Sequence, residues 1–401
     1  MSPLANIATE VPPAETIDYK SIAMLSAAHL TDDINQGVVP AMLPFFIASN
    51  HLTYAAAAGL ILAQTLSSSV MQPLFGLLAD WRPSPWLIPV GLGFAGIGVA
   101  LSGLAPTYAL IFAAIAVSGL GISAFHPEAA RRVRYLSGSR QATTMSFFTV
   151  GGMAGFAIGP LIITPVLIEF GTRGSIILAL PVLLMAVAVT HQLPRLAAAH
   201  ASASIENGSR SLVDAPEQWG DFIRLTVVVI FRSMVFFGLN TFIPLYWSHV
   251  LGGTKSGGGF ALTTLLAAVT AGTLLGGRMA DRYGRKIVIV VSLAALAPLM
   301  FCLLSLHSLI GAALLLVPVG IALSASNSVV VVMAQEYLPN RVGLAAGVTL
   351  GLSMTIGGLM MPLFGSIADH HGLRTALLLL ALIPALSCAV SMTLHEPGTP
   401  R

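Results

Sequence analysis

The chain has 401 residues, of which 56% are hydrophobic and only 9% are charged, and its mean hydropathy is +0.87. An ordinary globular protein is about 25% charged, so this composition excludes a water-soluble protein. The formal net charge of +3 gives no reason to expect a nucleic-acid partner. Two cysteines, both in apolar runs, cannot form a disulfide framework. The composition is typical of a protein whose solvent is membrane lipid.

Twelve apolar stretches long enough to cross a membrane follow one another along the chain, since a spanning helix needs about 20 such residues. The first six are expected at about 22–48, 55–79, 86–104, 107–135, 143–170 and 173–191, and the second six at about 222–249, 259–280, 287–306, 309–335, 342–368 and 373–393. We therefore predict an all-α membrane protein with 12 transmembrane helices in two six-helix bundles.

The bundles are expected over residues 21–191 and 222–393, and the polar segment 192–221 links them. The polar tails 1–20 and 394–401 lie outside the bundles, and the first lacks the basic start and cleavage site of a signal peptide. With the N-terminus in the cytoplasm, fifteen of the 19 Lys and Arg residues fall on the inner side and three on the outer side. This bias predicts that both termini and the linker are cytoplasmic.

An internal repeat relates the two halves. The segment Gly76–Asp80 recurs as Gly277–Asp281, an offset of 201, and Arg140 matches Arg341 at the same offset. Chance similarity between Gly-rich segments is the alternative, but a constant offset at separated points disfavours it. Duplicated six-helix halves are a feature of transporter folds. A finer echo relates residues 73–80 to residues 362–369, which suggests nested repeats.

The repeated segment predicts a device at the cytoplasmic face. Gly76 and Gly277 are expected to allow close helix contact, and Asp80 and Asp281 lie where they can cap the N-terminus of a neighbouring helix. The second copy continues through Arg282, Gly284, Arg285 and Lys286. These basic residues are expected to lock the inner face, although they serve equally well as positive-inside anchors.

Several motifs carry a family resemblance. They are 277–286, His29-Leu-x-x-Asp33-x-x-Gln36, Pro83-x-Pro85-Trp86, Phe125-His126-Pro127-Glu128-x-x-Arg131 and Ala334-Gln335-Glu336-x-Leu338-Pro339-x-Arg341. The first resembles the cytoplasmic signature of the major facilitator superfamily, and the others resemble the fosmidomycin resistance family of drug exporters. The first copy of the repeat departs from the signature, because it lacks the Gly-Arg-Lys ending, which suggests an asymmetric inner gate. The resemblance implies a monomeric exporter in a bacterial inner membrane.

Ionisable residues inside spans are costly in hydrocarbon and mark functional sites by default. In the first span, His29 and Asp33 are four residues apart and share a helix face, which Gln36 continues. Asp33 is therefore expected to face a central cavity, and Asp32 to be a structural charge partner. A purely structural role is the alternative for His29 and Asp33, and proton coupling is the alternative for Asp32.

The fourth span carries His126, Pro127 and Glu128, with Arg131 one turn further on. Arg131 can pair with Glu128 and offset part of the cost of its burial. We expect Glu128 to act with His29 and Asp33 in proton coupling, because all three are predicted at similar depth in one half. His126 assists them in this interpretation, and Arg131 serves as a charge partner.

The seventh span carries Arg232 at the level of the first-span acids but in the other half. A midplane arginine suits an anionic substrate group, which it can hold bidentately, and a buried charge partner is the alternative. Gln36, Asn240 and Phe236 are expected beside it in a substrate site. No spacing of histidines, cysteines and acids predicts a metal site.

The chain has no nucleotide-binding loop, so an ion gradient is expected to drive transport. Protons are expected rather than sodium ions, because the sequence shows no set of residues that would form a sodium site. The prediction is proton/drug antiport by alternating access of the two bundles, with no cofactor. An uptake symporter for a small organic anion or sugar is the alternative within the same fold. A receptor would need a larger soluble domain than the linker provides. A membrane enzyme would need a nucleophile beside His126 and Glu128, so the chain is not expected to be an enzyme.

Overall fold

The computed structural model describes residues 17–81, 84–137, 141–203, 217–341, 344–345 and 347–396, and within these ranges every regular element is a helix. The first half contains α1 (Tyr19–Asn50), α2 (Tyr54–Trp81), α3 (Leu87–Ser102), α4 (Tyr108–Tyr135), α5 (Gln141–Phe170), η1 (Thr172–Leu178) and α6 (Ala179–Ala203). The second half contains α7 (Trp219–His249), α8 (Lys255–Tyr283), α9 (Arg285–Ser305), α10 (Leu309–Ser324), α11 (Asn327–Tyr337), η2 (Gly347–Leu352), α13 (Ser353–Leu359), α14 (Met361–His371) and α15 (Leu373–Met392).

Each of the twelve predicted spans coincides with helix. In the described part of the chain, ten segments are long and apolar enough to cross a membrane. The other two predicted spans are α3, which is apolar but has 16 residues, and α1, which has 32 residues but carries several polar ones. The predicted tenth span is α10 followed by α11, and the predicted eleventh span is η2, α13 and α14 in series. The all-α membrane fold is therefore confirmed.

Helices extend into both ends of the segment 192–221 that was predicted to link the halves. Helix α6 continues past residue 191 to Ala203, and α7 begins at Trp219. Alanine-rich sequence after Pro194 sustains the helix, since alanine has the highest helix propensity. Residues 204–216 of the predicted linker lie outside the described residues.

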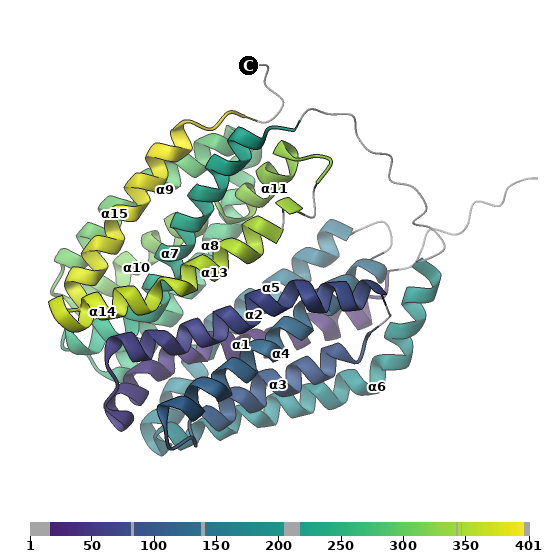
Figure 1. Cartoon of the computed structure of the whole chain (residues 1–401), viewed down its shortest axis with the longest axis horizontal. Helices are drawn as coiled ribbons and strands as arrows, with labels where there is room; N and C mark the ends of the chain where they lie inside the picture. The colour runs from purple at the N-terminus through teal and green to yellow at the C-terminus, as the bar shows by residue number, and fades with distance from the viewer. Residues whose placement is uncertain are drawn as a thin grey trace, which may run out of the picture.

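Figure 1 shows two helix groups side by side, with the purple-to-teal helices α1–α6 in one and the green-to-yellow helices of the second half in the other. Within the first group α1 packs on α5, and α4 packs on both α2 and α3. Within the second group α8 packs on α10, and α15 packs on α7 and α9. Between the groups, α5 packs on α8 and α2 on α14. The two groups enclose the centre of the molecule.

The two groups are held together at the end where α1 finishes and α2 begins. The carboxylate of Asp369, on α14, accepts hydrogen bonds from the backbone N–H groups of Tyr54 (2.7 Å) and Ala55 (3.0 Å), the first residues of α2. The Tyr54 hydroxyl lies 2.8 Å from Nδ1 of His249, on α7. The Lys255 ammonium lies over the ring of Phe45, 4.8 Å from its centroid. We call this region the closed end.

Asp369 belongs to the segment that echoes Asp80 in the sequence. Its carboxylate satisfies N–H groups that have no partner inside α2, and its negative charge faces the positive end of the helix dipole. The capping function predicted for the Asp80 segment is therefore performed by Asp369 in the related segment 362–369, across the interface between the two halves. Asp80 itself lies near the end of α2, and its side chain is outside the described residues.

The predicted close helix contact at Gly76 and Gly277 is wrong. A Cβ at Gly76 would lie 3.9 Å from Pro127, and one at Gly277 would lie 3.6 Å from Ser328, both ordinary van der Waals distances. The close approach in the second half falls one residue earlier, at Gly276, where a Cβ would meet the backbone of Ala325. One residue on a helix turns the face by about 100°, which the repeat pattern could not resolve.

The basic residues of the second repeat pair within their own half. Arg285 forms an ion pair with Glu336, and the Lys286 backbone N–H donates to Glu396 (2.9 Å). Gly284 joins α8 to α9 with φ of 93°, a conformation that favours glycine. Asp281 and Arg282 are exposed. Among the described residues no ion pair joins this face to the other half, so the predicted lock is not engaged in this arrangement.

Candidate functional site

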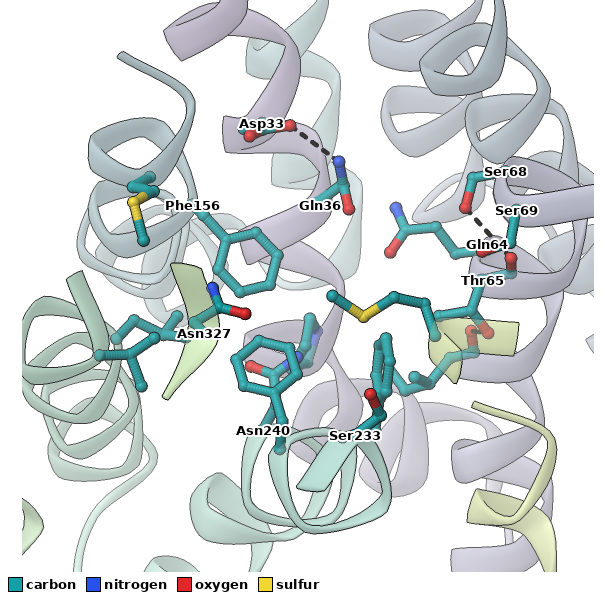
Figure 2. Close-up of a pocket in the computed structure, with 18 of the residues that line it drawn as sticks. Asp33, Gln36, Gln64, Thr65, Ser68, Ser69, Phe156, Ser233, Asn240 and Asn327 are labelled. Carbon is teal, nitrogen blue, oxygen red and sulfur yellow. Dashed lines mark hydrogen bonds between the residues drawn. The ribbon is translucent and has the colours of Figure 1, made fainter. Parts of the chain in front are cut away.

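A cavity of about 310 Å³ lies between the two halves, within the size range of small-molecule sites. Its ionisable and amide-bearing residues are Asp33, Gln36, Gln64, Gln72, His126, Arg232, Asn240 and Asn327. Apolar and aromatic side chains, among them Phe156 and Phe236, complete the wall. Figure 2 shows labelled polar side chains from α1, α2, α7 and α11 around the same space. The cavity can therefore take a small molecule that has both polar and apolar parts.

Three ionisable side chains meet at the wall formed by α1 and α4. Nε2 of His29 lies 3.3 Å from Oδ2 of Asp33, and Nε2 of His126 lies 3.4 Å from Oδ1 of the same carboxylate. The two Nε2 atoms are 3.2 Å apart. We call these three residues the Asp33 triad. The predicted contact between His29 and Asp33 is confirmed by these distances, whereas the third member is His126, which was expected only to assist them, and not Glu128.

The remaining ring nitrogens determine where the protons of the triad are. Nδ1 of His29 lies 2.8 Å from the carbonyl of Phe148, and Nδ1 of His126 lies 2.9 Å from the carbonyl of Ile122. A carbonyl only accepts hydrogen bonds, so both Nδ1 atoms carry hydrogen. In the neutral rings both Nε2 atoms are then acceptors, and they point at each other and at a carboxylate. At least one extra proton between these atoms relieves the repulsion between the lone pairs.

Asp33 and its neighbour Asp32 occupy different environments. Asp33 lines the cavity and accepts a hydrogen bond of 2.7 Å from Nε2 of Gln36, drawn as a dashed line in Figure 2. Asp32 is fully buried and does not line the cavity. Because successive helix positions differ by about 100°, only one of two adjacent acids can face the cavity. The prediction that Asp33 does so is confirmed.

Glu128 lies apart from the triad. Its carboxylate is fully buried, with Oε2 bonded to Arg131 (2.8 Å) and Oε1 bonded to Nε of Arg132 (2.7 Å). Arg132 also donates to the carbonyl of Leu196, on α6 (2.8 Å). The predicted pairing with Arg131 is confirmed, but the expected convergence of Glu128 with His29 and Asp33 is wrong. Glu128 follows His126 by two residues, which turns it about 200° around α4 and away from the cavity.

Helix α7 supplies the opposite wall. Arg232 lines the cavity with 6% of its surface exposed, and its Nε has no hydrogen-bond partner among the described residues. Asn240 also lines the cavity, and its Oδ1 has no partner within the described part of the chain. Phe236 stacks on Phe156 of α5, with ring centroids 6.1 Å apart. Unused hydrogen-bonding atoms beside aromatic rings suit an amphipathic ligand.

Helix α2 contributes polar residues that the sequence interpretation missed. Gln64, Ser68 and Gln72 line the cavity at intervals of four residues. This spacing places them on one helix face. A stripe of polar residues inside an apolar span is therefore the sequence signal that could have identified them. Asn327 lies at the first position of α11, where the tenth span is interrupted. The hydrophobic periodicity of the sequence does not reveal this interruption between α10 and α11.

Membrane-length helices in two groups around a central cavity, with ionisable groups on facing walls, define a membrane solute transporter rather than an enzyme. The Major Facilitator Superfamily model matches residues 25–348 and 225–401. The chain belongs to this superfamily.

The similar proteins agree with this assignment. The chain is 30% identical to the fosmidomycin resistance protein of Escherichia coli strain K12 over 387 residues, which cover 96% of this chain and 95% of that protein. It is 29% identical to an uncharacterized MFS-type transporter of Bacillus subtilis strain 168, over 93% of this chain and 92% of that one. Among solved structures, a bacterial homolog of the human lysosomal transporter Spinster, in an inward-facing and occupied conformation, superposes with a TM-score of 0.79 at 16% identity, over 94% of this chain and 97% of that one.

Proposed function

We propose that this transporter exports small molecules, fosmidomycin among them, across a bacterial inner membrane by proton antiport with alternating access. The observation that carries the proposal is the Asp33 triad, in which three acceptors converge at the cavity wall and require a proton between them. The similarity to a fosmidomycin resistance protein supports the substrate and the direction of transport. In the proposed cycle the triad releases its proton on the cytoplasmic side and takes up another outside.

The proposed orientation follows from the distribution of Lys and Arg, which places both termini in the cytoplasm. The closed end, with Asp369 against the start of α2, then faces outward. Substrate enters such an arrangement from the cytoplasm. We propose one chain as the transport unit, surrounded by membrane lipid, with the proton gradient in place of a cofactor.

The two walls of the cavity divide the task in this proposal. Gln36 and the triad form the proton-binding wall, whereas Arg232, Asn240 and Phe236 form the substrate-binding wall. A guanidinium binds phosphonate or carboxylate groups bidentately, and the aromatic ring contacts apolar parts of the same molecule. Both walls border one cavity, so substrate and proton influence each other directly.

The test is transport of labelled fosmidomycin in proteoliposomes with an imposed pH gradient. Wild-type protein is expected to move fosmidomycin against its concentration gradient, and Asp33→Asn is expected to lose this gradient-driven movement because the carboxylate that stabilises the proton of the triad is removed. Glu169→Gln, which removes an exposed acid at the end of α5, is the matched control. If Asp33→Asn accumulates fosmidomycin with the normal pH dependence, the assignment of coupling to the triad is wrong.

A proton-coupled uptake symporter for a small organic anion is the second candidate, and one observation favours it. An anion bound at Arg232 neutralises a positive charge across the cavity from the triad, which makes a proton at the triad easier to retain. Binding of an anion together with a proton is the linkage of a symporter. Net uptake of an organic anion driven by an inward proton gradient, with no fosmidomycin export, identifies this alternative.

A further inference from the structure

A second buried acid lies directly behind the triad. The side chain of Asp32 has no exposed surface, and neither of its oxygens has a hydrogen-bond partner among the described residues. Its Oδ2 lies 3.5 Å from Nδ1 of His126. An ionised carboxylate without donors in a membrane interior carries a large desolvation cost.

The surroundings of Asp32 provide few charges to offset that cost. Helix α1 packs on α5, α4, α6, α7, α3 and α2, and also touches η1 and α8. Helix α3 has no ionisable residue, and α5 has one, Glu169, at its far end. The ionisable neighbours of Asp32 are His126 on α4 and Asp33 on α1. Asp33 is itself an acid, so an ionised Asp32 beside it adds repulsion.

His126 contacts both acids, one with each ring nitrogen. Its Nε2 faces Asp33 at 3.4 Å, and its Nδ1 lies near Asp32 at 3.5 Å while donating to the carbonyl of Ile122. His126 and Asp33 line the cavity, and Asp32 does not. The His126 ring therefore lies between the cavity and Asp32.

We propose that Asp32 is a second proton-binding residue, loaded from the cavity through His126. The inference rests on the proposed proton coupling and sets its stoichiometry at two protons per cycle. Before loading, the proton of the triad is on Nε2 of His126, so that the ring is an imidazolium beside the Asp33 carboxylate. In the loading step the hydrogen on Nδ1 moves to Oδ2 of Asp32. Asp32 becomes a carboxylic acid, Asp33 remains a carboxylate, and the ring becomes the neutral Nε2–H tautomer. The reverse step restores the imidazolium.

Infrared spectroscopy of the purified full-length protein tests the protonation of Asp32 without any substrate. The wild type is expected to show the carbonyl stretch of a buried carboxylic acid, shifted by transfer to D₂O, and Asp32→Asn is expected to lose it. Asp221→Asn is the matched control, because Asp221 is equally buried but accepts hydrogen bonds from Arg224 and His395. A band that persists in Asp32→Asn overturns the proposal.

The relay through His126 has its own test. In His126→Gln the infrared band of Asp32 is expected to remain, while its exchange in D₂O slows at least about tenfold. Unchanged exchange in this variant shows another path to Asp32 and overturns the relay. This variant also tests the proposal if Asp32→Asn does not fold.

Stoichiometry separates this inference from the proposed function. The ratio of fosmidomycin concentrations at equilibrium, measured against the imposed pH gradient in proteoliposomes, is expected to give two protons in the wild type and one in Asp32→Asn. A wild type that ignores the pH gradient contradicts proton antiport itself. A wild type that responds, with the same ratio in Asp32→Asn, contradicts only the second proton site.

Discussion

Gly152 of α5 lies against the Asp33 triad, and its replacement by alanine is expected to disrupt proton binding. A Cβ at this position would lie 2.5 Å from Oδ2 of Asp33 and closer still to Nε2 of His29. These two atoms are 3.3 Å apart, so the methyl group would enter between them. An ordinary contact of about 3.4 Å requires Asp33 to move by about 0.9 Å. The hydrogen bond between imidazolium and carboxylate is then broken.

The size of the effect follows from that bond. A hydrogen bond to a charged group contributes about 1.5–3 kcal/mol, and each 1.4 kcal/mol is a factor of ten in affinity. The bond stabilises the protonated triad, so its loss weakens proton binding by about tenfold to hundredfold. The midpoint of the pH profile of transport is therefore expected to shift toward acidic pH by about one to two units in Gly152→Ala.

The assay is fosmidomycin transport in proteoliposomes at a series of pH values, with thermal unfolding of the same preparations. Gly93→Ala is the matched control, because a Cβ at Gly93, on α3, has no heavy atom within 4 Å. Overpacking at Gly152 costs about 1–3 kcal/mol of stability, whereas Gly93→Ala is expected to be neutral or slightly stabilising. A pH profile of Gly152→Ala that coincides with that of the control would refute the role assigned to the triad.

Three other variants test the remaining contacts. Asp369→Asn removes the charge that caps α2, so the closed end is expected to open about tenfold more often; unchanged distances between labels on the two halves contradict this. Glu128→Gln leaves the charges of Arg131 and Arg132 buried with a weakened partner. We expect it to lower the unfolding free energy by about 3–5 kcal/mol and to keep the pH profile of the surviving protein; a stable variant with altered coupling instead supports the original prediction for Glu128. Arg232→Gln is expected to weaken binding of anionic substrates at least about tenfold and of neutral ones little, as measured by calorimetry; an equal loss for both classes indicates a structural arginine.

The fold and part of the site follow from local patterns in the sequence. Hydropathy and the 201-residue repeat give the twelve spans, and the four-residue spacing of His29 and Asp33 places them on one helix face. The rotation of each helix about its own axis is harder to predict from the sequence. Glu128 and Gly277 were each assigned to the right helix but to the wrong face, because an error of one or two residues turns a side chain by about 100° or 200°.

Sequence patterns do not predict contacts between segments that lie far apart in the chain. The pairing of Asp369 with the start of α2 joins residues more than three hundred positions apart. Arg132, together with Arg131, binds Glu128 and lies four residues after it, which is the spacing of an ion pair within a helix. Two adjacent arginines at the end of a span also fit the pattern of membrane anchors. The structure distinguishes these roles, because Arg132 is fully buried.

The charge of the substrate determines how its binding is linked to the proton. An anion at Arg232 favours a protonated triad, whereas a neutral or cationic molecule that occupies the cavity beside Asp33 disfavours it. Antiport requires that substrate binding release protons from the cavity. Antiport of fosmidomycin therefore requires that its contact with Asp33 outweigh the effect of its negative charge at Arg232. On that condition we expect proton release when fosmidomycin binds to the purified protein in weakly buffered solution, followed with a pH indicator, and no release in Asp33→Asn. Proton uptake in the wild type contradicts antiport and favours the symporter, since an electrostatic link of that sign makes proton and anion travel together.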